Sequence, residues 1–118
     1  MKKLLPIMLF VLLAFAGCQK GPAMYERAEN PRQFVGNVEK FVKQTSKRSK
    51  HYSEEDWQVA VKQFIAMSKD YVENMNYLTA DEQMRYDYAR LQFMSAIDAN
   101  GTEAITAQVK EEYSRVLP

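Results

Sequence analysis

The stretch Tyr52-Ser53-Glu54-Glu55-Asp56-Trp57 marks a helix start more strongly than any other part of this 118-residue chain. Ser53 is a favoured N-cap residue, and the three acidic residues after it occupy the first turn, where the helix dipole stabilises negative charge. Tyr52 and Trp57 have the spacing of a hydrophobic staple across the cap. Apolar residues then follow in alternating steps of four and three, interrupted only by Ser68, at positions 57, 61, 64, 71, 75 and 78. This spacing predicts a long amphipathic helix packed against neighbouring helices.

Another helix is predicted before this one. Asn30-Pro31 combines a capping residue with the residue best suited to the first helical position, and Gln33 stands at the capping-box position. We expect this helix to run from Pro31 to about Ser49, with an apolar stripe that includes Phe34, Val38 and Phe41.

Two further helices are predicted after Leu78. Thr79 has an acid three residues later, which forms a second capping box, and the short connection predicts an antiparallel hairpin with the preceding helix. Asn100-Gly101 predicts its end because both residues tolerate a left-handed backbone, and Thr102 caps a last helix. The sequence has no persuasive strand alternation. The chain is therefore predicted to be all-α, a small antiparallel bundle of three to four short helices.

The N-terminal residues have the pattern of a secretory signal peptide. Lys2-Lys3 precedes an apolar run of 13 residues, 4–16, and Gly17-Cys18 follows it. At about 1.5 Å per helical residue this run reaches about 20 Å, short of the ~30 Å core of a bilayer. We therefore predict a removable signal segment over residues 1–17.

The small pair Ala16-Gly17 directly before Cys18 resembles the lipobox of bacterial lipoproteins, with Phe15 where that family prefers an aliphatic residue. The resemblance implies cleavage between Gly17 and Cys18 and acylation of Cys18. A rival cut after Ala16 is also open, because residues 14–16 satisfy the small-x-small rule of ordinary signal peptidase. Cys18 would then be a free thiol or form an intermolecular disulfide, since the chain has no second cysteine.

The lipoprotein resemblance also implies a location. Gln19 follows the cysteine in place of the aspartate that retains some lipoproteins at the inner membrane, which favours the outer membrane and its periplasmic face. Two or more acyl chains would hold the protein stably on the lipid bilayer. The predicted organisation is a signal peptide over 1–17, an acylated cysteine with a flexible tether over 18–30, and a helical domain over 31–118.

The motif that opens at Tyr52 brings a second resemblance. With the aromatic helix after it and with Leu78-Thr79, it is similar to a group of small helical lipoproteins of Gram-negative anaerobes whose function is unassigned, over roughly residues 34–95. This resemblance supports the helical fold and supplies no catalytic residues.

Charge is balanced overall and uneven along the chain. Loss of Lys2 and Lys3 lowers the basic count from 16 to 14, against 15 acidic residues, which argues against a nucleic-acid partner. Residues 31–50 carry six basic residues and one acid, whereas residues 51–118 carry six basic and twelve acidic residues. The basic run contains Lys43, Lys47, Arg48 and Lys50. It either complements a helix dipole and aids solubility, or contacts anionic lipid, lipopolysaccharide or an acidic partner.

The third predicted helix has apolar residues on two opposite faces. Met84, Tyr88 and Leu91 lie on one face, and the other face contains Tyr86, Phe93 and Ile97. Such a helix is either sandwiched between its neighbours, with its tyrosines and methionines in the core, or it exposes a surface of tyrosine and methionine, which are enriched where proteins bind proteins. We take the second face, together with the basic run, as the candidate interaction surface.

The sequence predicts an interaction or scaffolding module of the cell envelope with a protein partner, and no enzyme. The alternative is a binder of small apolar ligands with a pocket lined by Trp57, Phe64, Tyr88 and Leu91. His51 is the only histidine, and the consecutive acids 54–56 lack the spacing of a calcium loop. No phosphate-binding loop, dinucleotide motif or nucleophile elbow is present, so we predict neither a metal site nor a cofactor.

Overall fold

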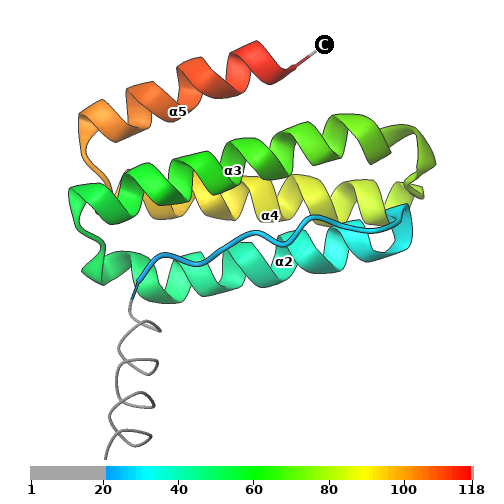
Figure 1. Cartoon of the computed structure of the whole chain (residues 1–118), viewed down its shortest axis with the longest axis horizontal. Helices are drawn as coiled ribbons and strands as arrows, with labels where there is room; N and C mark the ends of the chain where they lie inside the picture. Colours follow the sequence, from blue (N-terminus) through cyan, green and yellow to red (C-terminus); the bar gives the residue numbers. More distant parts are fainter. Residues whose placement is uncertain (1–20, 118) are drawn as a thin grey trace, which may run out of the picture.

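Each helix of the structure begins directly after a residue that the sequence marks as an N-cap (Figure 1). The structure is a computed structural model and describes residues 21–117. Its elements are α2 (Pro31–Arg48), the short 3-10 turn η1 (Ser49–His51), α3 (Glu54–Asn74), the 3-10 turn η2 (Met75–Tyr77), α4 (Ala80–Asn100) and α5 (Glu103–Val116). These described residues contain no strand, which confirms the predicted all-α class. The predicted signal peptide, residues 1–17, and the lipidation site Cys18 lie outside the described residues.

The strongest predicted helix start is confirmed at the level of hydrogen bonds. Ser53 Oγ accepts a hydrogen bond from the backbone N–H of Asp56 at 3.1 Å, and the N–H of Ser53 donates to Asp56 Oδ2 at 3.0 Å. The rings of Tyr52 and Trp57 meet edge to face with centroids 5.0 Å apart, as expected for a hydrophobic staple. A reciprocal pair of the same kind starts α4 at Thr79. These caps fix where two of the four helices begin.

Two helix ends differ from the prediction. Asn30 caps α2 through its side chain, but Gln33 Oε1 accepts from the N–H of Glu29, so the predicted capping box is not closed. Gly101 has φ −90° and ψ 171°, an extended backbone instead of the expected left-handed one. A Cβ at this position would lie 2.9 Å from the carbonyl oxygen of Ile97. Glycine is therefore needed here for close approach to the end of α4.

The helices form an antiparallel bundle around aromatic side chains. In Figure 1, α2, α3 and α4 lie side by side, and α5 packs against α3 on the side away from α2. Stacked rings fill the space between α3 and α4: Phe64 lies on Phe93 with centroids 4.3 Å apart, and Tyr71 lies on Tyr86 at 4.0 Å. The predicted bundle of three to four helices is confirmed with four, and its core lies between α2, α3 and α4.

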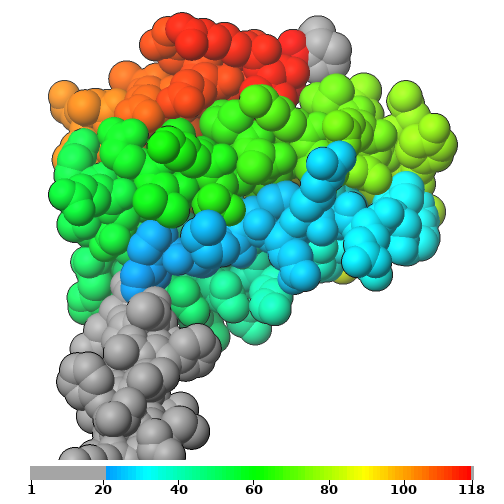
Figure 2. Space-filling model, in the orientation of Figure 1, coloured from blue at the N-terminus to red at the C-terminus, as the bar shows by residue number. Residues whose placement is uncertain are grey.

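Residues 21–30, which we call the strap, correct the prediction of a flexible tether over 18–30. The strap runs along the outside of α2 and α3 as an extended segment (Figures 1 and 2). Ala23 is 1% exposed, its N–H donates to Tyr52 Oη at 3.0 Å, and the N–H of Tyr25 donates to Gln63 Oε1 at 2.8 Å. The folded unit therefore begins at the strap and not at Pro31.

Candidate interaction surfaces

The predicted interaction face of α4 is buried, so this part of the prediction is wrong. Tyr86, Phe93 and Ile97 are at most 1% exposed. In addition to the α3 rings described above, Phe34 of α2 lies against Tyr86 and Phe41 of α2 lies against Phe93, with centroids 5.6 and 5.8 Å apart. These rings cover the face because α2 and α3 both pack on it, and it is unavailable to a partner in the folded protein.

The opposite face of α4 is exposed. Met84, Tyr88 and Leu91 are 70%, 65% and 54% exposed, and they stand at positions i, i+4 and i+7 of the helix. This spacing places them in one row, which we call the α4 stripe. The stripe holds three of the six large apolar side chains that are exposed in the described part of the chain. The bundle therefore covers one apolar face of α4 and leaves the other open.

An open groove of about 430 Å³ lies beside the α4 stripe, between α4 and α2. Tyr88 and Leu91 form its apolar wall, and Ser46 of α2 lies at its other side. At one end Asn100 Nδ2 donates to Ser49 Oγ at 3.0 Å, which ties the end of α4 to η1. The groove combines an apolar ridge with hydrogen-bonding side chains, as at the contact surfaces of proteins.

The ligand pocket expected from Trp57, Phe64, Tyr88 and Leu91 is not formed. Trp57 and Phe64 are buried in the core, whereas Tyr88 and Leu91 belong to the exposed stripe. The four side chains lie on opposite sides of the helix layer and cannot enclose one ligand. The placement of this pocket between the second and third predicted helices was wrong because the aromatic stacking there fills the space.

The basic run of α2 divides into two parts. Lys43 and Lys47 are exposed on the outer face of α2, and Lys50 is exposed in η1, whereas Arg48 is half-buried beside the strap. Arg48 Nη1 donates to the carbonyl oxygen of Gly21 at 3.5 Å. The prediction placed these four residues in one cluster, but helical geometry separates Arg48 from the lysines.

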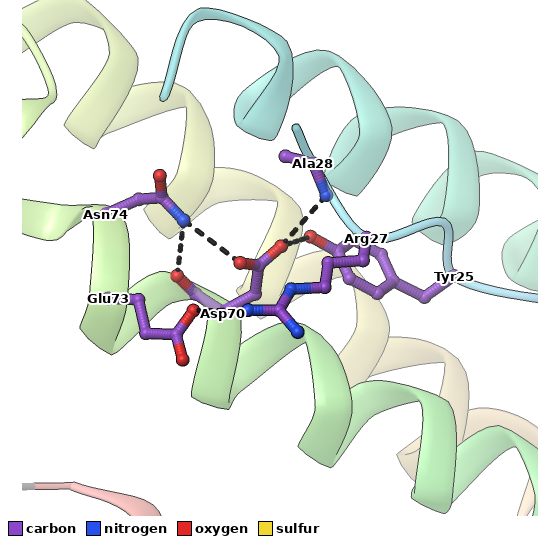
Figure 3. A network of polar contacts seen from close by, with 6 residues as sticks. All are labelled: Tyr25, Arg27, Ala28, Asp70, Glu73 and Asn74. Carbon is purple, nitrogen blue, oxygen red and sulfur yellow. Dashed lines mark hydrogen bonds and ion pairs between the residues drawn. The ribbon is translucent and has the colours of Figure 1, made fainter. Parts of the chain in front are cut away.

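A buried carboxylate holds the strap against α3 (Figure 3). Asp70 is 5% exposed, and its Oδ2 accepts from the hydroxyl of Tyr25 and, at 3.2 Å, from the N–H of Ala28. Its Oδ1 accepts from Asn74 Nδ2 at 3.0 Å. Burial, followed by the Asp70 carboxylate, raises the pKa of Tyr25 well above its ordinary value, so the proton stays on the hydroxyl that Asp70 accepts from. This network is structural, since every oxygen of Asp70 is already engaged.

The residues weighed for catalysis lie apart. His51 is exposed at the end of η1, and Asp56 is engaged in the capping box of α3. Within residues 21–117, no group of three or more His, Cys, Asp or Glu side chains is placed to hold a metal ion. In the same residues no helix is both long and apolar enough to cross a bilayer.

Comparisons of this chain with family models, with curated proteins and with solved structures found no match. The lipobox and the likeness to small helical lipoproteins therefore remain predictions from the sequence.

Proposed function

We propose that this protein is a lipid-anchored helical lipoprotein of the cell envelope that serves as an interaction or scaffolding module. In this proposal Cys18 carries the acyl anchor, the outer membrane holds the protein on its periplasmic face, and the α4 stripe contacts a protein partner. The observation that carries the proposal is the exposed α4 stripe on a bundle whose core is already filled.

The composition of the α4 stripe supports a protein contact. Aromatic residues and methionine are enriched at protein interfaces, and the stripe presents one tyrosine, one methionine and one leucine in a single row. An amphipathic helix that docks in the groove of another protein uses anchors at this helical spacing, so α4 itself has the pattern of such a helix.

The predicted anchor makes the stripe available for this role. An acylated cysteine attaches a protein to a bilayer without any apolar protein surface. Membrane attachment therefore does not explain why Met84, Tyr88 and Leu91 stay exposed.

Photo-crosslinking in intact cells tests the proposal. A photoreactive residue is placed at Tyr88 or Leu91, with a control at Lys62, an exposed residue of α3. We expect one recurrent protein adduct from both stripe positions and none from Lys62, identified by mass spectrometry. Absence of an adduct at the stripe, or the same adducts at Lys62, would contradict the proposed contact.

The anchor is tested separately. Replacement of Cys18 by alanine should yield a protein without acyl chains, because no other residue can carry the lipobox acylation. Intact-mass analysis of the membrane-bound protein should show the mass of the acyl chains. Absence of the acyl mass from the unmodified protein, or the same acyl mass on the Cys18→Ala variant, would contradict the lipoprotein assignment.

A further inference from the structure

Four lysines form a row on the outer face of α2 and η1. Lys40, Lys43, Lys47 and Lys50 are all exposed and follow one another at steps of three, four and three residues. At about 100° per residue this spacing keeps them within roughly 80° of one another around the helix, opposite the buried face of α2. We call this row the lysine stripe; it replaces the predicted run by adding Lys40 and excluding Arg48.

The charge of the lysine stripe is not compensated by its own helix. Glu39 is the only acidic residue of α2, and its two carboxylate oxygens accept from Arg85 of α4, with Arg85 Nε 3.1 Å from Oε2. Between residues 21 and 117, no lysine of the stripe is within ion-pair distance of a carboxylate. Twelve of the fifteen acidic residues of the chain lie beyond position 50. The stripe therefore presents positive charge to the solvent.

The strap begins at the end of the bundle where the last lysine of the stripe, Lys50, also lies. Arg48 holds the carbonyl oxygen of Gly21, and Tyr52 holds the N–H of Ala23, so the chain enters the fold beside the C-terminal end of α2 (Figure 1). Only Gln19 and Lys20 separate Gly21 from Cys18. Three residue steps span at most about 10 Å. A lipid on Cys18 would therefore hold Gly21 within about 10 Å of the anchored residue, and Arg48 at the end of α2 contacts Gly21 directly.

We propose that the lysine stripe lies against the anionic phospholipid headgroups of the membrane that anchors the protein. This inference rests on the proposed anchor at Cys18. The reach of about 10 Å is comparable to the Debye length of about 8 Å at physiological ionic strength, so salt does not screen the attraction fully. Each lysine near an anionic surface strengthens the contact roughly five-fold. In this orientation α5, which packs on the far side of α3 from α2, points away from the membrane (Figure 1).

Lysine acetylation of the membrane-anchored protein tests this orientation. The protein is purified from membranes, reconstituted in vesicles of phosphatidylglycerol or of phosphatidylcholine, and treated briefly with an amine-reactive acetylating reagent. We expect acetylation of the four stripe lysines to be about five-fold slower on the anionic vesicles. The acetylation rate should recover in 0.5 M salt, because the attraction between charges is strongly screened at that concentration. The exposed lysines Lys62, Lys69 and Lys110 of α3 and α5 are internal controls and should change less than about two-fold.

Two triple variants with the same change in charge sharpen the test. In K43E/K47E/K50E, the remaining stripe lysine Lys40 should lose its protection on anionic vesicles. In K62E/K69E/K110E, Lys40 should keep it. All six positions are exposed, and circular dichroism checks that both variants stay helical. Equal protection of Lys40 in the two variants, or equal protection of stripe and control lysines in the unmodified protein, would overturn the inference.

Failure of the anchor and failure of the stripe are distinguishable. Intact mass reports whether Cys18 carries lipid. If it does not, the free thiol of Cys18 is coupled to a maleimide lipid in the same vesicles, and acetylation is repeated at the same attachment point. Protection of the stripe then supports the membrane contact without the biological anchor. If the stripe lysines are protected from acetylation in cells but not on vesicles, whether the protein is attached by its own acyl chains or by the maleimide lipid, an acidic protein covers them in cells. That result would overturn the inference.

Discussion

The two apolar faces of α4 are similar in composition, but one is buried and the other is exposed. Tyr86, Phe93 and Ile97 lie under the rings of α2 and α3, whereas Met84, Tyr88 and Leu91 face the solvent. The same contrast between a covered and an open position recurs in α3, at Asp70 and Glu73, and at the two glycines Gly101 and Gly36. The difference teaches that in this small bundle the role of a residue follows from what covers it more than from its type.

The largest expected effect is at the covered face of α4. Replacement of Phe93 by alanine should lower the free energy of unfolding by about 3–5 kcal/mol, because it removes a ring stacked against Phe64 and leaves a cavity. Replacement of Leu91 by alanine, two residues away on the open face, should cost at most about 1 kcal/mol. Urea denaturation of both variants measures the difference. Similar losses at the two positions would mean that the open face is covered as well.

A smaller effect is expected where the strap is covered. Asp70→Ala removes the acceptor for the Tyr25 hydroxyl and for the N–H of Ala28, which should cost about 1–3 kcal/mol. Glu73, on the same helix, pairs with Arg27 of the strap at 3.0 Å, but both side chains are exposed. Glu73→Ala should therefore cost about 0.5 kcal/mol or less.

Thermal unfolding compares these two variants, and proteolysis near residue 25 reports whether the strap is released. We expect faster cleavage in the Asp70 variant only. Unchanged cleavage in that variant would show that the Asp70 network does not hold the strap.

The smallest pair of effects has opposite signs. Gly36 is exposed in the middle of α2, and a Cβ there would meet nothing within 4 Å, so Gly36→Ala should stabilise the protein by about 0.5–1 kcal/mol through helix propensity. At Gly101 the Cβ would press on the carbonyl oxygen of Ile97, so Gly101→Ala should destabilise it by about 1 kcal/mol. Midpoints of urea unfolding decide the signs, and stabilisation at both glycines would show that the end of α4 can shift freely.

The helices could be predicted because a few residues close together in the sequence determine where each helix begins. The caps at Ser53, Thr79 and Thr102 need only side chains within three positions, and each begins a helix in the structure. Local hydrogen bonding therefore carries most of the information about helix boundaries.

Which face of α4 is buried could not be predicted from the helix alone. With apolar residues on both sides, its periodicity does not point to one face, and the choice depends on where Phe34, Phe41 and Phe64 of other helices come to lie. The face with Tyr86 and Phe93 meets those rings and is therefore the buried one. The two apolar faces of α4 were predicted correctly, but the face predicted to be exposed is the buried one.

The strap was missed for a different reason. Its backbone is extended and its side chains have no helical or strand periodicity, so composition suggests a linker. Its attachment depends on Asp70, a buried acid 45 positions from Tyr25 in the chain. Lys40 was missed because the predicted basic cluster followed neighbours along the chain instead of neighbours on the helix surface.

The path of the strap has a mechanical consequence. The chain enters the fold at the C-terminal end of α2, runs the length of the bundle and then turns back into α2 at Asn30 (Figure 1). A pull on the chain ahead of Gly21 therefore loads the strap contacts one after another, from the Gly21–Arg48 hydrogen bond toward the Asp70 network, before it reaches the start of α2. Each freed residue adds up to about 3.5 Å of reach, and the whole strap about 35 Å. The strap is thus a stored length of chain that yields before the helices of the bundle do.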